Sequence, residues 1–372
     1  MTLFFISYPV LTRILQIDIQ IMNSSLYCPA SMDHLYNIAC GIEKFALTLW
    51  IQINSKPMKI TKLFAILSFF AFLNFNCIND QSDEVYVFSY FTGNGEDGLH
   101  LSYSLDGLNW ETLQEGKSFL TPTAGDDKLM RDPCIIKGGD GLYHMVWTVS
   151  WNEKGLGYAS SPDLIHWSKQ MTIPVMAHEA GARNTWAPEI FYNEEEAYYM
   201  IFWSTTIEGK YLETQSKEES GYNHRKYYTT TKDFVEFTPT ELLYEPGFNV
   251  IDGSIINENG EYIMFVKDET REPAQKNIRI TRSKSLTGGY GSASEPITGD
   301  YWAEGPTVAK VGDQWIVYFD KYTEKKMGAV ASKDLVNWKD ISDQVNFPKG
   351  TRHGTVFKIS MAELEKLKKA VL

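Results

Sequence analysis

The sequence predicts an all-β protein, a single domain folded as a five-bladed β-propeller. The main observation is a recurring pattern of an acidic or histidine residue, a small or turn residue, and then an apolar strand. Five copies begin 49 to 63 residues apart, at Asp132, Glu189, Asp252, Glu304 and His353. Repeats of roughly this length are typical of propeller blades. Acidic residues at the starts of successive blades are expected to converge on one central axis.

Each copy continues into a hairpin and then into a third segment. An apolar run, a polar turn and a second apolar run occupy 135–149, 255–266 and 308–319, and such turns are typical of β-hairpins. The third segment combines a strand, a Ser-x-Asp turn and an aromatic residue. Its copies are 101–110, 158–167 and 329–338, with weaker ones at 228–237 and 280–290. Because these aromatic residues recur in every repeat, we interpret them as packing residues.

The order of the segments predicts how the ring closes. The first segment that ends in an aromatic residue, 101–110, precedes the first copy of the pattern, which begins at Asp132. Little chain follows the last copy, which begins at His353. The N-terminal strands must therefore complete the last blade, which closes the ring and removes exposed sheet edges. The five blades then extend from about residue 85 to residue 360.

Composition narrows the functional classes. The chain has 372 residues, 14% of them aromatic, and a formal net charge of −12. That charge argues against nucleic acid or an anionic membrane surface as a partner, and we expect a monomer. The sequence contains no CxxC pair and no Gly-rich phosphate loop, and we expect no organic cofactor. Of the four cysteines only Cys134 falls within the repeats, so no disulfide is expected there.

The N-terminal region differs from the repeats. A cationic stretch at 58–62, an apolar run at 63–75 and then Cys77 form the pattern of a bacterial secretory signal that ends at a lipid-bearing cysteine. We therefore predict a signal peptide over 58–77, a polar tether over 78–84 and the catalytic propeller over 85–372. Residues 1–57 are interpreted as an upstream mis-start of the reading frame, with an extended leader as the alternative.

This signal predicts export across the inner membrane. The protein is expected to be periplasmic or an outer-membrane lipoprotein at the cell surface, attached to the membrane only through Cys77. Residues 73–76 lack the small side chains usual before a lipidated cysteine. Ordinary cleavage and a retained anchor therefore stay open as alternatives.

Three of the acidic residues that begin copies of the pattern carry the predicted chemistry. Asp132, Asp252 and Glu304 are each acceptable as turn residues on their own. Gathering them at one axis, however, costs free energy through desolvation and like-charge repulsion, so the set indicates catalysis. Hydrolysis of a sugar linkage with inversion needs a general acid and a general base roughly 6.5–9.5 Å apart, and opposite sides of a narrow propeller axis could provide that spacing.

The three residues receive different roles. Glu304 is the expected general acid, because its neighbours Trp302 and Pro306 predict an apolar surround that would raise the pKa of its carboxyl group. Asp132 is the expected general base that activates water. Asp252, between them in the sequence, would tune and orient the acid.

Residues beside the acidic starts are candidates for substrate binding. Trp186 and Trp302 flank acidic starts and are expected to stack on a sugar face, with a place in the propeller core as the alternative. Arg352 or Arg183 would pair with a catalytic carboxylate, and the sequence does not distinguish the two.

Glu189 and His353 are the first residues of the two remaining copies of the pattern. Glu189 would bind a sugar hydroxyl or support the surroundings of Asp252, or it is a rim carboxylate without a role. His353 is expected at the axis, in direct or water-mediated contact with a central cation, although a lone histidine is more often a structural residue.

Taken together, these motifs resemble glycoside hydrolase family 43. The matching motifs are Arg131-Asp132-Pro133, Trp186-Ala187-Pro188-Glu189, Ile251-Asp252-Gly253-Ser254, Glu304-Gly305-Pro306 and Arg352-His353-Gly354. Segments 90–94 and 104–110 are similar to the opening of members often labelled arabinosidase or xylanase. Each motif is weak alone, but five in this order at blade spacing are fairly specific.

The resemblance implies a five-bladed propeller and an inverting mechanism. It implies Asp132 as general base, Asp252 as modulator of the acid and Glu304 as general acid. His353 matches the family's axial histidine, which in many members lies near a bound calcium ion. One departure is Glu189, since the family commonly has Asp after Trp-Ala-Pro; this change affects the expected pocket shape and not the catalytic set.

Three functional hypotheses follow. The leading one is an exo-acting inverting glycosidase that removes α-L-arabinofuranosyl or β-D-xylosyl residues from plant polysaccharides or oligosaccharides. The second is action on a galactoside or fructoside, or phosphorolysis, although the sequence lacks the Asn-Asp-Pro and Glu-Cys motifs of related fructosidases and shows no basic phosphate cluster. The third is a catalytically silent glycan-binding surface lipoprotein, which the presence of all three acids disfavours.

Overall fold

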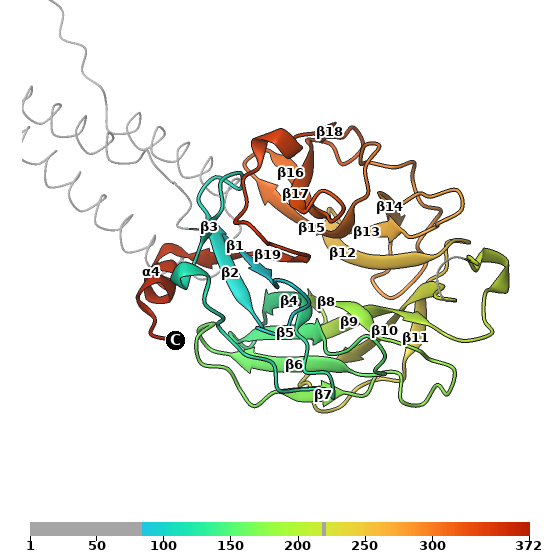
Figure 1. The fold of residues 1–372 in the computed structure, drawn as a ribbon, viewed down its shortest axis with the longest axis horizontal. Helices are drawn as coiled ribbons and strands as arrows, with labels where there is room; N and C mark the ends of the chain where they lie inside the picture. Colours follow the sequence, from blue (N-terminus) through green and yellow to red (C-terminus); the bar gives the residue numbers. More distant parts are fainter. Residues whose placement is uncertain (1–83, 218–220) are drawn as a thin grey trace, which may run out of the picture. The chain divides into compact units, whose positions relative to one another are not determined.

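Antiparallel hairpins dominate the structure, a computed structural model that describes residues 84–217 and 221–372 (Figure 1). The predicted mis-start at 1–57, the signal peptide with Cys77 and the tether up to residue 83 lie outside the described residues. No helix within the described ranges is both long enough and apolar enough to cross a membrane.

The strands form five separate sheets, each of which is one blade. Blade 1 contains β4 (Arg131–Lys137), β5 (Tyr143–Thr148), β6 (Leu156–Ser161) and β7 (Met171–Ile173). Blade 2 contains β8 (Trp186–Asn193), β9 (Tyr198–Thr206), β10 (His224–Thr231) and β11 (Glu241–Tyr244). Blade 3 contains β12 (Val250–Glu258), β13 (Glu261–Asp268) and β14 (Asn277–Ser283). Blade 4 contains β15 (Glu304–Val311), β16 (Gln314–Lys321), β17 (Lys326–Ser332) and β18 (Lys339–Asp340).

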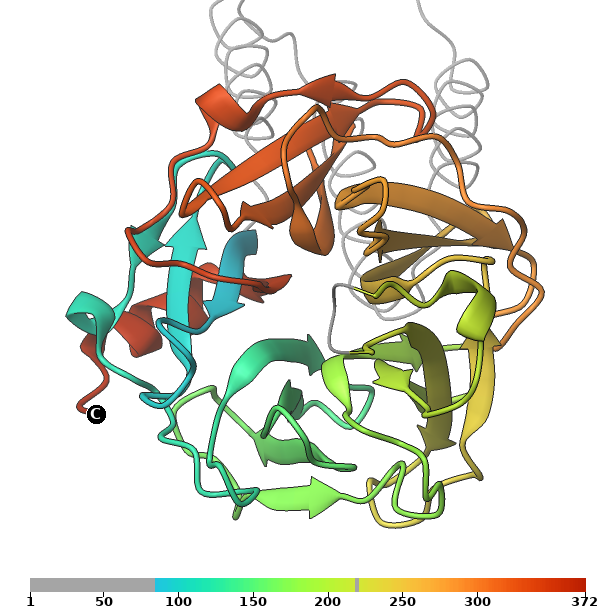
Figure 2. The same ribbon diagram turned by 45° about the vertical axis from the view of Figure 1, so that its right-hand side comes forward.

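Blade 5 joins the two ends of the propeller. It contains β19 (Gly354–Ser360), β1 (Glu84–Tyr90), β2 (His100–Ser104) and β3 (Glu111–Thr112). β1 pairs antiparallel with β19 along its whole length, from Glu84 opposite Ser360 to Tyr90 opposite Gly354. Figure 2 shows the five sheets arranged around a common axis. The predicted five-bladed propeller and its closure by the N-terminal strands are confirmed.

Hydrophobic cores lie between neighbouring blades. Trp147 of β5 is fully buried in the core between blades 5 and 1, and Trp203 of β9 in the core between blades 1 and 2. Phe265 and Phe319 occupy the core between blades 3 and 4. Burying one large apolar side chain contributes about 1.5–3 kcal/mol, so these layers hold the blades at fixed angles around the axis.

The repeated Ser-x-Asp segments form turns with the same hydrogen bonds. The Asp106 carboxylate accepts from the backbone N–H groups of Leu108 and Asn109, each at 2.8 Å. Asp163, Asp233 and Asp334 make the equivalent pairs of bonds. In the first copy the aromatic residue packs inward, as predicted: the Trp110 ring stacks on Phe347 at 5.0 Å and is 4% exposed.

A C-terminal helix follows the last strand and was not predicted. Helix α4 (Met361–Lys369) begins at Ser360, whose side chain and Glu363 form a capping box. Leu364 and Leu367 are buried in the core between blades 5 and 1. The segment was missed because the repeat pattern ends before it, and only nine residues form the helix.

Candidate active site

β-Bulges near the starts of four inner strands shape the site. In these strands the pairing register shifts between Arg131 and Cys134, Trp186 and Glu189, Ile251 and Ser254, and Glu304 and Thr307. One residue in each bulge has a left-handed backbone: φ is 51° at Asp132, 47° at Ala187, 54° at Asp252 and 61° at Gly305. Bulges bend a strand and re-aim its side chains, which here turns them toward the axis.

The sequence suggested that the acidic residues occupy equivalent positions in their blades, and the bulges show that they do not. The four left-handed residues are the equivalent positions, so Glu304 precedes the equivalent position in its blade by one residue, and Glu189 follows its own by two. The acidic starts are therefore not a ring of matching residues. The difference was not visible in the sequence, because a bulge adds one residue without interrupting the apolar pattern of the strand.

Asp132 is held by two partners. Its Oδ1 lies 3.2 Å from Nδ1 of His353, and its Oδ2 accepts from the Thr148 hydroxyl at 2.9 Å. Thr148 in turn accepts from the backbone N–H of Ala187 at 2.9 Å, which leaves its hydroxyl proton for Asp132. Burial would raise the pKa of Asp132, but the His353 ring and Thr148 lower it to about 2, so the group is ionised at neutral pH.

His353 lies among the carboxyl groups at the axis and is 4% exposed. Burial acts to lower its pKa, but Asp252 and Asp132 together raise it to about 9. The ring is therefore an imidazolium at neutral pH. A buried cation in this place offsets the repulsion between the carboxylates.

Gly305 links Asp252 to Glu304. The backbone N–H of Gly305 donates to Asp252 Oδ2 at 2.8 Å, and a Cβ on Gly305 would collide with the ring of His353. Together with a φ of 61°, this close contact favours glycine at the position. These contacts fix the backbone beside Glu304. Burial also raises the pKa of Asp252.

Glu304 is surrounded by charges and not by the apolar residues that the sequence suggested. Its Oε2 lies 3.1 Å from Nζ of Lys267, and its Oε1 lies 3.2 Å from Nη2 of Arg352. Trp302, the expected apolar neighbour, instead lies beside Tyr322 at 5.9 Å and Lys276 at 5.7 Å. The expectation was wrong because Trp302 lies outside β15, which begins at Glu304, and its ring contacts Tyr322 and Lys276 instead.

Arg352 connects Glu304 to a second acidic residue, Asp320. Its Nε lies 2.6 Å from Asp320 Oδ2, and Asp320 is opposite Glu304 in the β15–β16 ladder. Asp320 is fully buried, and burial together with the nearby Glu304 raises its pKa to about 6. The structure thus pairs Arg352 with Glu304, whereas the guanidinium of Arg183 lies over the ring of Tyr222 at 4.3 Å.

The second strand of each hairpin supplies residues that the sequence interpretation missed. Opposite the bulges lie Thr148, Ser204, Lys267 and Asp320. Each follows two apolar residues: Val146-Trp147, Phe202-Trp203, Phe265-Val266 and Tyr318-Phe319. A polar residue at the end of each second apolar run is a repeated signal, and it could have identified this set.

Glu189, predicted to bind a sugar hydroxyl, to support the surroundings of Asp252 or to be a rim carboxylate, is buried. It is 5% exposed. It accepts hydrogen bonds from the Cys134 thiol at 3.3 Å and the Thr355 hydroxyl at 3.1 Å. Burial raises its pKa to about 7. Its position two residues past the left-handed bulge residue places it inside the propeller, so it is no rim carboxylate.

An aromatic cluster lies beside the Asp132 side of the site. Trp186 is partly exposed, donates to the backbone oxygen of Trp151 at 3.0 Å and meets the Trp151 ring edge to face at 5.3 Å. Tyr222 lies 4.8 Å from Trp186 on another side. Trp151 is 40% exposed and carries the Arg131 guanidinium over its face at 4.3 Å. Such rings can stack on the apolar face of a sugar.

The donor set does not favour a metal ion held by side chains. Within the described ranges, no three His, Cys, Asp or Glu residues are grouped where they could bind one. Calcium takes six to eight oxygen ligands, whereas Asp132 and His353 engage each other. An axial calcium ion is implied by the family resemblance alone, and no step below depends on it.

Three known proteins are similar to parts of this chain. An α-L-arabinofuranosidase from Bifidobacterium longum subsp. longum is 25% identical over 225 residues, which is 52% of this chain; the match spans only 21% of that protein. The α-L-arabinofuranosidase of Lactobacillus brevis has a TM-score of 0.44 at 18% identity, covering 57% of this chain and 72% of that one. A thermostable family-43 glycoside hydrolase has a TM-score of 0.49 at 16% identity, covering 62% and 80%.

The match to a protein family is more extensive. Residues 82–365 fit the profile of the family related to glycoside hydrolase family 43, described as "Probable glycosyl hydrolase domain". That range includes all five blades and every site residue described above. The protein therefore belongs to the glycoside hydrolase family 43-related family.

Proposed function

We propose that this protein is an exo-acting, inverting glycoside hydrolase. Its substrates would be plant polysaccharides or oligosaccharides, from which it removes α-L-arabinofuranosyl or β-D-xylosyl residues. The observation that carries the proposal is the pair of carboxyl groups Asp132 and Glu304, held in different ways on two blades around one axis. The similarity to an α-L-arabinofuranosidase supports the choice of sugar.

Asp132 acts as the general base in this proposal. Its two oxygens are fixed by His353 and Thr148, and each oxygen keeps a lone pair that can accept a proton. An ionised carboxylate in a fixed orientation can take a proton from water as the water attacks the anomeric carbon. The His353 imidazolium keeps Asp132 ionised between turnovers.

Glu304 acts as the general acid. Its carboxyl group donates a proton to the glycosidic oxygen as the bond to the leaving group breaks, and Lys267 and Arg352 hold it in place. Asp252 positions the acid through the Gly305 N–H. After the reaction the proton from water resides on Asp132 and Glu304 is ionised, so one proton transfer through solvent restores the starting state.

A leaving-group comparison tests the acid. A Glu304→Gln protein should lose about 10²- to 10⁴-fold in kcat/KM on an oligosaccharide. It should lose far less on a 2,4-dinitrophenyl glycoside, whose leaving group needs no proton. Equal losses on both substrates, or full activity on the oligosaccharide, would remove Glu304 from this role.

Product analysis tests the stereochemistry and the sugar. Proton NMR of the first product should show the anomer opposite to that of the substrate; retention would refute the inverting mechanism. A panel of nitrophenyl α-L-arabinofuranoside, β-D-xyloside and β-D-galactoside identifies the sugar. Turnover of the galactoside alone would favour the exo-galactosidase alternative. Oligosaccharide binding without any product would favour the non-catalytic surface lipoprotein.

Membrane attachment is a separate proposal that rests on the signal-like sequence before Cys77. Cells that express the full chain should incorporate labelled palmitate into it, and Cys77→Ala should abolish the incorporation. Equal labelling of both proteins would refute lipidation at Cys77.

A further inference from the structure

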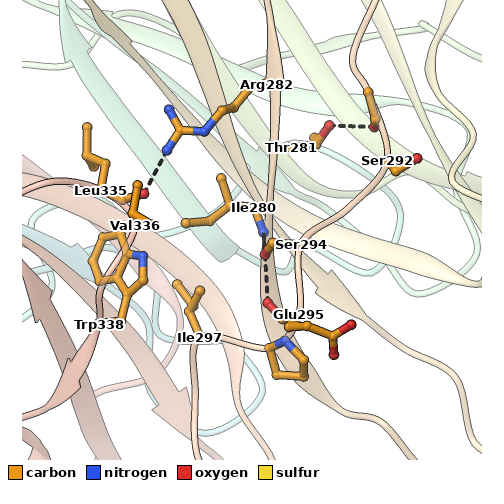
Figure 3. A pocket seen from close by; sticks show the side chains of 12 residues that line it. Ile280, Thr281, Arg282, Ser292, Ser294, Glu295, Ile297, Leu335, Val336 and Trp338 are labelled. Carbon is orange, nitrogen blue, oxygen red and sulfur yellow. Dashed lines mark hydrogen bonds between the residues drawn. The ribbon is translucent and has the colours of Figure 1, made fainter.

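A pocket of about 460 Å³ lies away from the acidic residues, where the outer edge of blade 3 meets blade 4 (Figure 3). One wall comes from β14 and the chain that follows it. The other wall is the Ser-x-Asp turn between β17 and β18, which includes Val336 and Trp338. Pockets of this size are sufficient for a small organic ligand.

The pocket exists because blade 3 has three strands where each of the others has four. In place of a fourth strand, the chain after β14 makes only scattered backbone bonds to it: Ser294 N–H to Ile280 oxygen at 2.8 Å, and Ile297 N–H to Ile278 oxygen at 2.9 Å. These bonds satisfy the strand edge. The irregular segment does not pack flat, and the pocket lies between it and blade 4.

The lining combines an apolar floor with polar groups at the rim. Ile280, Ile297 and Trp338 form the floor, and Val336 at the mouth is 70% exposed. Figure 3 shows the nitrogen-bearing edge of the Trp338 indole turned toward Ile280 and Ile297. This N–H is buried and has no acceptor among the described residues. A buried donor without a partner costs free energy, and a ligand oxygen would relieve that cost once a shift of the Trp338 ring exposed the N–H to the pocket.

The charges on the lining disfavour an anionic ligand. Arg282 is the cation present, and its guanidinium is occupied by Glu261 at 2.8 Å and by the backbone oxygen of Leu335 at 2.7 Å. Glu295 is exposed on the rim, and within the described ranges no cation pairs with its carboxylate. An aromatic and aliphatic floor beside hydroxyl and carboxylate acceptors suits a neutral, polyhydroxylated molecule.

We propose that this pocket is a second glycan-binding site, which holds a neutral segment of the polysaccharide whose ends reach the active site. The choice of ligand rests on the proposed function. The site would bind sugar units through stacking on Trp338 and contact with Val336, and would keep the enzyme on the polymer between cleavage events. No catalytic step takes place there.

Affinity electrophoresis of the purified protein in gels that contain soluble arabinoxylan or arabinan tests this site, with Glu304→Gln in every protein to prevent digestion. Val336→Glu adds a charge at the mouth, and Ser292→Trp fills the opposite rim. The matched control is Val235→Glu: Val235 occupies the same turn position in blade 2, is 77% exposed and does not line the pocket.

Both pocket variants should bind at least one polymer about tenfold more weakly than the control does, which corresponds to the loss of one strong contact. Equal retardation of Val336→Glu and Val235→Glu, or no retardation of any protein, would overturn the proposal. Thermal unfolding confirms that each variant is folded. If Val336→Glu does not fold, the binding of Ser292→Trp is compared with that of the control instead. The readout is binding, so it stands even if no glycoside is hydrolysed and the proposed function fails.

Discussion

Replacing Glu189 with glutamine should stabilise the propeller at alkaline pH and leave its stability unchanged in acid. The Glu189 carboxyl group is 5% exposed and its hydrogen-bond partners are the uncharged Cys134 and Thr355 side chains. A glutamine amide has nearly the same shape and can keep one bond to each partner. The substitution therefore removes the ionisable proton and little else.

The magnitude follows from the pKa of this group. Burial raises the pKa of Glu189 from 4.5 to about 7. A change of one unit in pKa corresponds to about 1.4 kcal/mol, so the difference between 4.5 and about 7 corresponds to about 3 kcal/mol of folding free energy. Below pH 4.5 both states of the protein are protonated and the cost is absent. Between pH 4.5 and 7 the unfolded chain ionises first, and above pH 7 the folded state carries the whole cost.

Urea unfolding followed by tryptophan fluorescence measures the effect. At pH 8 the Glu189→Gln protein should be more stable than the natural sequence by about 3 kcal/mol, and near pH 4.5 the two should agree within about 0.5 kcal/mol. A control, Glu194→Gln, changes an exposed residue just after β8 and should have no effect at either pH. A Glu189→Gln gain that is equal at both pH values, or no gain at all, would refute the reasoning.

Three further predictions concern the site. His353→Gln removes the cation that lowers the pKa of Asp132 to about 2, so activity at pH 4 relative to pH 6.5 should fall; an unchanged pH–rate profile would show that His353 has no electrostatic role. Gly305→Ala should cost at least 2 kcal/mol more stability in urea unfolding than Gly312→Ala, because both have positive φ but only Gly305 lies against the His353 ring; equal costs would contradict this packing. Dialysis against EDTA should change activity less than twofold, because His353 and Thr148 hold Asp132 without an ion; a loss that calcium reverses would contradict this.

Periodic patterns in the sequence determined the architecture. The repeating hairpins and Ser-x-Asp turns predicted five blades, and the order of the segments predicted that β1 would pair with β19. These features were predictable because strand alternation and turn chemistry depend on residues close together in the sequence, and because each blade repeats the same strand-and-turn pattern. The sequence also indicated that Asp132, Asp252 and Glu304 would approach the axis.

Tertiary structure alone decided which side chains meet at the axis. A bulge re-aims a side chain without changing the apolar pattern, so Glu189 became a buried residue and not a rim carboxylate. Asp320 reaches Arg352, the partner of Glu304, from the strand that pairs with β15, and Lys267 reaches Glu304 from β13 of the neighbouring blade. The charged surround of Glu304 and the pocket beside β14 likewise depend on contacts between blades. Such long-range contacts form between residues far apart in the chain, where no short pattern records them.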